Sequence, residues 1–144
     1  MDYPVGFDSA KHSNKPICGV LAMAIVCEVS YDVAHAACKA AMFEIFPWRK
    51  RFGGGTSLAI SDLVMSRLAT KFEKHTVRKG GPILRLHHWV RYMTKPDVTY
   101  LVRTPGHIMT VRNHCVIDQT RSCNFLLREN RKVTHWYEIK GKGW

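Results

Sequence analysis

The sequence predicts an α+β fold, with helices in the first part of the chain and an antiparallel sheet in the rest. Two patterns support this. An apolar segment near the N-terminus and an Ala-rich segment after it are typical of packed helices, whereas the later segments are rich in β-branched residues. The chain has 144 residues, 46% of them hydrophobic and 23% charged, which is typical of one globular domain. We therefore expect a single domain over residues 1–144.

The helical part is predicted from hydrophobic spacing and capping residues. The first expected helix is apolar on all sides and should be buried on every side. Ser30 is a good N-cap for the second helix, and Thr56 or Ser57 for the third. Pro96 ends the fourth. We expect these helices at about Ile17 to Glu28, Tyr31 to Phe43, Leu58 to Phe72 and Ile83 to Met93.

The remaining segments are interpreted as a sheet. Short runs rich in Val, Ile and aromatic residues alternate with turn residues, as expected of strands. Lys79-Gly80-Gly81-Pro82 is predicted to be a turn, and residues 124–130 a short turn or helix. The expected strands are Val98 to Val102, His107 to Val111, Cys115 to Asp118 and Val133 to Ile139.

The charge of the chain is strongly basic. It has 22 Lys and Arg against 11 Asp and Glu, a formal net charge of +11, and the excess lies mostly in the second half. Such a surface favours nucleic acid, an acidic host protein or a phosphorylated ligand, although solubility alone explains it equally well. The sequence has no basic motif interleaved with aromatic residues and no zinc-finger pattern, either of which would support nucleic-acid binding.

The cysteine pattern indicates a reducing compartment. The count of five is odd and there is no Cys-x-x-Cys, which argues against a disulfide framework and a zinc knuckle. His87 and His88 are adjacent on a helix and diverge, so they make a poor metal pair. We therefore expect no metal and no cofactor, and a cytoplasmic location.

The N-terminal apolar run is predicted to be a core helix. Lys11 and Lys15 precede it, as in a signal peptide, but Asp2 and Asp8 lie upstream and small residues for cleavage are poorly placed. The run ends at Glu28 and is too short to span a bilayer. We expect no membrane partner.

Cys18 is the leading candidate for a nucleophile. It stands at the start of the most apolar segment of the chain. The dipole at the N-terminus of a helix lowers a cysteine pKa and favours thiolate at neutral pH. Gly19 beside it is expected to leave room for a substrate backbone. A single cysteine in an apolar helix is more often inert core, so the argument depends on partners.

His107 and Asp118 are the candidate partners, as base and as the acid that orients the imidazole. They belong to two strands joined near Arg112-Asn113-His114. A two-residue loop, either Arg112-Asn113 or Asn113-His114, places both side chains on one face, whereas a three-residue loop places them on opposite faces.

An oxyanion hole requires hydrogen-bond donors near the sulfur. Cys18 offers its own backbone N–H. Asn14 is the first candidate for a side-chain donor and His12 the second, since both lie just before the helix. Asn14 is an equally good candidate for the N-cap of that helix.

The segment Ile17-Cys18-Gly19-Val20-Leu21-Ala22-Met23-Ala24 resembles the Cys-Gly-x-x-x-Leu-Ala helix of papain-like cysteine peptidases. The resemblance is to the bacteriocin-leader (double-glycine) branch. It is closer to small phage and bacterial proteins of the superfamily, which have sequence segments similar to Ser30 to His35, Gly54-Gly55-Thr56, Gly106-His107 and Asp118. It spans most of the chain through short motifs. Unlike that branch, this chain has Ile17 before the cysteine and no Gln before Gln119.

This resemblance implies a papain-like fold, with the nucleophile on a buried helix packed on a C-terminal antiparallel sheet. It implies Cys18 as nucleophile, His107 as base and Asp118 as orienting acid. The expected function is a cysteine hydrolase, of peptidase, isopeptidase or thioesterase type, acting on a protein or peptide substrate, in the host cytoplasm if the protein is phage-encoded. The alternatives are a catalytically inactive papain-like fold that binds nucleic acid or an acidic host protein, and a purely structural small phage protein.

Overall fold

The computed structural model describes residues 4–5, 18–53, 56–117 and 131–142. These residues form four helices and a five-stranded antiparallel sheet, which confirms the α+β class. The strand order is β1-β5-β2-β3-β4. The elements are α2 Cys18–Val26, α3 Tyr31–Ile45, α4 Leu58–Arg67, β1 Thr70–Thr76, α5 Leu86–Tyr92, β2 Tyr100–Thr104, β3 His107–Arg112, β4 Cys115–Ile117 and β5 His135–Lys142.

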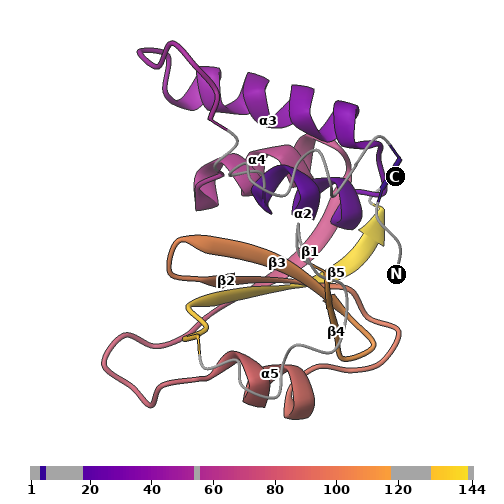
Figure 1. Ribbon diagram of the computed structural model, residues 1–144, viewed down its shortest axis with the longest axis vertical. Helices are drawn as coiled ribbons and strands as arrows, with labels where there is room; N and C mark the ends of the chain where they lie inside the picture. The colour runs from indigo at the N-terminus through magenta and orange to yellow at the C-terminus, as the bar shows by residue number, and fades with distance from the viewer. Residues whose placement is uncertain (1–3, 6–17, 54–55, 118–130, 143–144) are drawn as a thin grey trace.

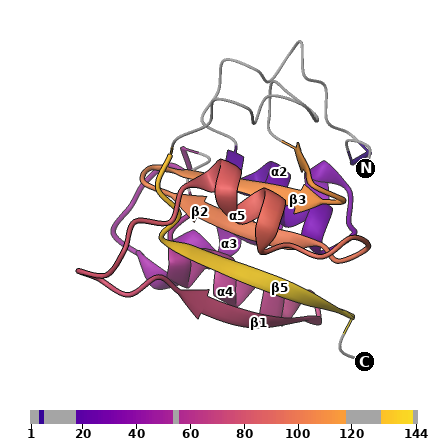
Figure 2. The same cartoon turned by 90° about the horizontal axis from the view of Figure 1, so that it is seen from below.

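Helices cover both faces of the sheet, but unequally. Helices α2, α3 and α4 lie together on one face, and the short helix α5 lies on the other (Figure 1). Seen from the α5 side, α5 lies over the β2–β3 part of the sheet, while β5 and β1 run beside it (Figure 2). We call these the α2 face and the α5 face of the sheet.

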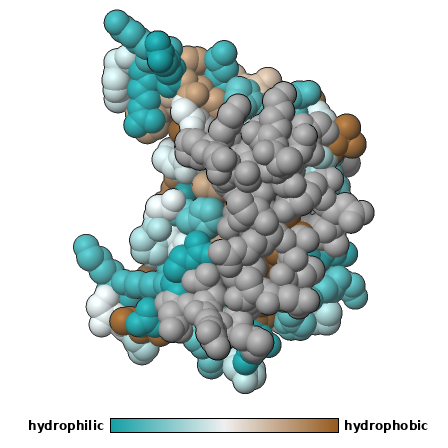
Figure 3. Space-filling view, in the orientation of Figure 1, coloured by the Kyte–Doolittle hydropathy of each residue, from teal (hydrophilic) through white to brown (hydrophobic). Residues whose placement is uncertain are grey.

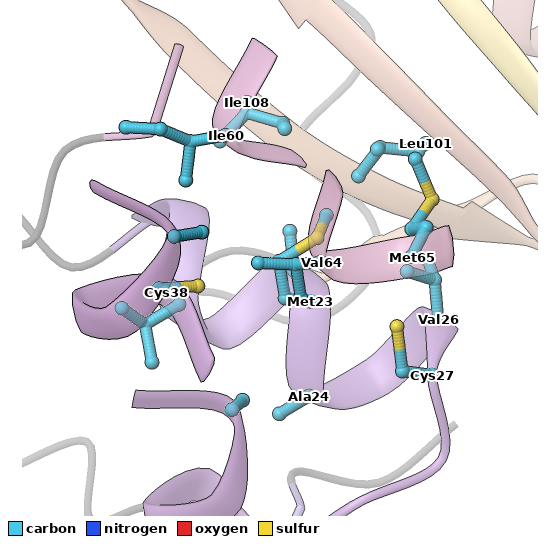
Figure 4. Packing of buried hydrophobic residues seen from close by; sticks show 14 of the residues in the cluster. Met23, Ala24, Val26, Cys27, Cys38, Ile60, Val64, Met65, Leu101 and Ile108 are labelled. Carbon is cyan, nitrogen blue, oxygen red and sulfur yellow. The ribbon is translucent and has the colours of Figure 1, made fainter. Parts of the chain in front are cut away.

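Each face has its own hydrophobic cluster. The larger cluster joins α2, α3 and α4 to Leu101, Ile108 and Tyr137 of the sheet, and its side chains interdigitate (Figure 4). The smaller cluster joins Trp89 of α5 to the strand residues of opposite parity, such as Val102 and Met109. Because successive strand residues point to opposite faces, the two clusters show which face each residue occupies.

The predicted helix caps are confirmed. The Ser30 hydroxyl accepts a hydrogen bond from Val33 N at 3.3 Å, and Ser57, not Thr56, accepts one from Ile60 N at 3.3 Å. Helix α2 is buried along nearly its whole length, as its uniformly apolar sequence predicts.

The prediction was wrong around residue 70. The third helix ends at Arg67 instead of Phe72, and Thr70–Thr76 forms β1, which the sequence analysis missed. Ala69 adopts a left-handed φ of 56°, which ends the helical path and turns the chain into the sheet. Strand β1 is largely polar and pairs on one side only, with β5, so its sequence carries a weak strand pattern.

Smaller differences concern the ends of elements. Helix α5 begins at Leu86, not Ile83, and β2 and β5 begin two residues later than expected, at Tyr100 and His135. The predicted turn before α5 is present, with Gly81 N donating to Arg78 O at 3.1 Å and Gly80 at a φ of 83°. The segment 124–130 lies outside the described residues.

The cysteines differ from expectation in one respect. Cys18, Cys27 and Cys38 are outside disulfides, whereas Cys115 belongs to one. The sequence pattern was interpreted as one without disulfides, and a single bridge is compatible with its odd cysteine count because it leaves an odd number of thiols.

Among the described helices, none is by itself long and apolar enough to cross a membrane. Helices α2 and α3 reach that length and composition only when taken together, with a bend of 115° between them.

Candidate active site around Cys18

Cys18 is the first residue of α2, as predicted. Its side chain is half-buried and packs against the cluster of the α2 face. Cys27 and Cys38 are fully buried in that cluster, with exposed fractions of 0%. Burial, followed by the charge of Cys27, raises the pKa of the Cys38 thiol to about 12. Of the three cysteines outside disulfides, Cys18 is therefore the one that solvent reaches.

The residue beside Cys18 has a different role from the one predicted. A Cβ on Gly19 would lie 2.0 Å from Thr56 Oγ1 and 2.7 Å from Thr56 Cγ2. The space beside Gly19 is thus filled by the Thr56 side chain, not left open for a substrate backbone. Gly19 allows the start of α2 to pack against the loop before α4.

Arg103 of β2 has a charge interaction with Cys18, and the sequence analysis did not single it out. It lies on the α2 face, two residues from buried Leu101, and its charge interacts with that of Cys18. Burial lowers the pKa of the Arg103 guanidinium, while the charges of Tyr137, Asp62 and Cys18 oppose this shift. A guanidinium beside a thiol favours the thiolate.

A hydrogen-bond network holds this guanidinium against α4. Arg103 donates from Nη2 to Ser61 Oγ at 3.0 Å, and the Tyr137 hydroxyl donates to Asp62 Oδ1 at 2.7 Å. Lys74 Nζ donates to the other Asp62 oxygen at 3.1 Å. Burial, and then the hydrogen bond to Asp62, raise the pKa of Tyr137. The network fixes the position of this positive charge against α4.

His107 is the first residue of β3, the strand against which α2 packs. Ile108, the residue after it, pairs with Arg103. Because Arg103 also interacts with Cys18, the start of α2 and the start of β3 belong to the same corner of the fold.

The direction of the His107 side chain follows from strand alternation. Ile108 packs in the cluster of the α2 face and Met109 in that of the α5 face. His107 has the parity of Met109, so its Cα–Cβ bond starts toward the α5 face, away from the side on which Cys18 packs. For His107 and Cys18 to form a catalytic pair, the His107 side chain must turn past the end of β3 toward the α2 face.

The β3–β4 hairpin has the two-residue loop Asn113-His114, one of the two predicted alternatives. Both loop residues have left-handed φ values, 52° and 59°, as tight hairpins of this length require. Arg112 pairs with Cys115 and Thr110 with Ile117. Asp118, Asn14 and His12 lie outside the described residues, so the orienting acid and the oxyanion donor stay predictions.

A pocket of about 420 Å³ lies beside this corner. It is lined by Thr56, which contacts Gly19, and by two cationic side chains, Arg49 and Arg51, of the loop after α3. Hydrophilic residues protrude over this loop, at the top of the space-filling view (Figure 3). The nearest recess to the start of α2 among those described here is therefore basic and suits an acidic ligand.

Comparisons with protein-family models, with curated proteins and with solved structures give no match.

Proposed function

We propose that this protein is a cysteine hydrolase, of peptidase, isopeptidase or thioesterase type, with Cys18 as nucleophile. The observation that carries the proposal is the position of Cys18: a half-buried thiol at the N-terminus of a buried helix, with a charge interaction with the Arg103 guanidinium. Both the helix N-terminus and the guanidinium favour the thiolate, which is the reactive form. His107 and Asp118 are the proposed base and orienting acid.

The chemistry follows from these roles. The Cys18 thiolate attacks the carbonyl carbon of an amide or thioester, and a C–S bond forms. The Cys18 backbone N–H faces the developing oxyanion. The leaving amine or thiol takes a proton from the His107 imidazolium as its bond to the carbonyl breaks. Water gives a proton to the imidazole and attacks the acyl carbon, which breaks the C–S bond, releases the acyl group as a carboxylic acid and restores the thiolate and the imidazolium.

The test is trapping of an acyl-enzyme. We expect p-nitrophenyl acetate to give a burst of p-nitrophenol, with one acetyl group on Cys18 identified by mass spectrometry of peptides. Cys18→Ala should abolish the burst, and Cys38→Ala, at a buried thiol, should keep it. His107→Ala should slow both acylation and release. Acetylation distributed equally over all thiols, or a burst that survives Cys18→Ala, would refute the proposal.

A second candidate function is a catalytically inactive binding module. The strand parity of His107, which starts toward the face opposite Cys18, favours this candidate. A groove of about 660 Å³ on the α5 side adds to it, because its lining includes Arg78, Arg85, His87 and His88 and no acidic residue among those described. Such a groove suits an acidic host protein or nucleic acid.

Salt dependence separates the two candidates. For the binding module we expect capture of an acidic peptide or an oligonucleotide that weakens steeply with salt and is unchanged by Cys18→Ala. Arg78→Ala and Arg85→Ala should each weaken it, while Arg67→Ala, on the other side of the sheet, should not. Absence of the acyl-enzyme burst together with such binding would replace the hydrolase with the binding module.

A further inference from the structure

Three metal-ligating side chains converge on the open part of the α5 face. They are Glu73 and His75 of β1 and Glu138 of β5, and their ligand atoms all lie within 4.8 Å of one another. The side chains of His75, Glu73 and Glu138 are 35%, 55% and 20% exposed, so solvent reaches the cluster. Two carboxylates and an imidazole make a donor set that suits a divalent transition ion, Zn²⁺ above all.

The strand register makes this cluster a costly arrangement without a cation. Glu73 and Glu138 are directly opposite each other in the β1–β5 ladder. Like charges placed directly across a sheet are destabilising. The chain has twice as many basic as acidic residues, so two glutamates directly opposite each other are unexpected.

A side-chain cation already bridges the two carboxylates. Lys140 Nζ lies 3.0 Å from Glu138 Oε1 and 3.4 Å from Glu73 Oε2. A flexible, exposed ammonium on a long stem can leave such a position readily, since exposed ion pairs contribute little to stability.

The imidazole of His75 is oriented by a stacking contact with a neighbouring ring. The His75 ring stacks on the Trp136 indole, with ring centroids 4.9 Å apart and an angle of 12° between the planes. His75 Nε2 lies 3.3 Å from Glu73 Oε1, so its nitrogen is directed toward the carboxylates. The stacking limits the rotation of the ring that binding would otherwise have to fix.

We propose that Glu73, His75 and Glu138 form a binding site for a divalent transition metal, with Zn²⁺ the preferred ion, and that the ion displaces the Lys140 ammonium. Three protein ligands leave the fourth tetrahedral position to water. The site lies on the α5 face and uses none of the residues assigned to hydrolysis, so it stands independently of the proposed function.

The test is titration of the full-length protein with ZnCl₂ at pH 7.5, followed by calorimetry and by Trp136 fluorescence. We expect one ion per chain at this site. Glu138→Gln, Glu73→Gln and His75→Gln should each weaken binding by about tenfold or more. Lys140→Met should strengthen it, because the competing ammonium is gone. Glu44→Gln and His88→Gln, at exposed positions elsewhere, are the matched controls and should bind as the wild type does.

Cobalt distinguishes this site from the thiols. Co²⁺ bound to Glu73, His75 and Glu138 should quench Trp136 and show no thiolate-to-metal charge-transfer band. The proposal is overturned if neither the wild type nor Lys140→Met binds Zn²⁺, if the three ligand variants bind as tightly as the wild type, or if the cobalt spectrum shows thiolate coordination.

Discussion

The face of the sheet that meets α2, α3 and α4 carries the larger hydrophobic cluster, whereas on the α5 face the strands β1 and β5 gather acidic and imidazole side chains in contact with solvent. On the α2 face, the proposed nucleophile lies at the margin, where α2 begins and Arg103 carries charge next to the core. On the open face, Glu73, His75 and Glu138 gather without core packing around them. In both cases the proposed site lies beside, not within, a hydrophobic cluster, and each face can be tested separately.

The largest expected effect is a loss of stability from a substitution on the α2 face. Leu101→Ala removes a side chain with an exposed fraction of 0% from the cluster of the α2 face. We expect a loss of about 2–5 kcal/mol in the free energy of unfolding, from lost burial and the remaining cavity. Ile83→Ala, at a side chain that is 57% exposed, should change it by less than about 0.5 kcal/mol. Urea denaturation measures both, and equal losses would contradict the comparison.

The contact between Gly19 and Thr56 comes next. A Cβ at residue 19 would overlap the Thr56 side chain, so Gly19→Ala should cost about 1–3 kcal/mol of stability by overpacking. Thr56→Ala in the same chain should recover part of the loss. Gly53→Ala is the matched control, because nothing lies within 4 Å of its added Cβ. A neutral Gly19→Ala would show that the loop before α4 does not pack on α2.

A substitution at Thr110 is expected to increase stability, by a smaller amount. It is fully buried on the sheet, and its Oγ1 has no hydrogen-bond partner among the described residues. Thr110→Val keeps the shape and removes the unpaired hydroxyl, so we expect a gain of up to about 1 kcal/mol in thermal or urea unfolding. Thr94→Val is the contrast, because the Thr94 hydroxyl donates to Val90 O at 2.6 Å, and it should destabilise the protein. The same sign for both variants would be inconsistent with this account.

The smallest expected effect depends on pH. Burial, and then the charges of Lys74 and Arg103, lower the pKa of His135 below its usual 6.5. As the pH falls below 6.5 the unfolded chain takes up the proton first, so stability is lost on acidification. His135→Gln should flatten the part of this dependence between pH 7 and 5, measured by urea midpoints at each pH. A steeper dependence in the variant would show that the sign is wrong.

The fold was predictable where local chemistry agrees with packing. Apolar α2 and the serines at residues 30 and 57 marked the helices, and Asn113 marked the hairpin loop. Strand β1 was missed because its polar sequence is stabilised by β5, a partner 59 to 72 residues away along the chain. Pairing between segments so far apart leaves little trace in the local pattern.

The candidate site was predictable only in part. The position of Cys18 at a helix start followed from the sequence, but Arg103 did not, although a charge two residues after Leu101 on an inward-facing strand position was a usable signal. The use of Gly19 for packing also required the structure, because Thr56 is brought to it by the tertiary fold. The Glu73–Glu138 pair depends on the register between β1 and β5, which no local pattern specifies.

The central claim is that the Cys18 thiol works with the His107 imidazole, and the pH dependence of Cys18 alkylation tests it most directly. We predict that iodoacetamide modifies Cys18 as a thiolate at pH 6, far faster than buried Cys38, and that His107→Ala reduces this reactivity at low pH. A Cys18 rate that rises only with the ordinary ionisation of a thiol, and is the same in His107→Ala, would contradict it.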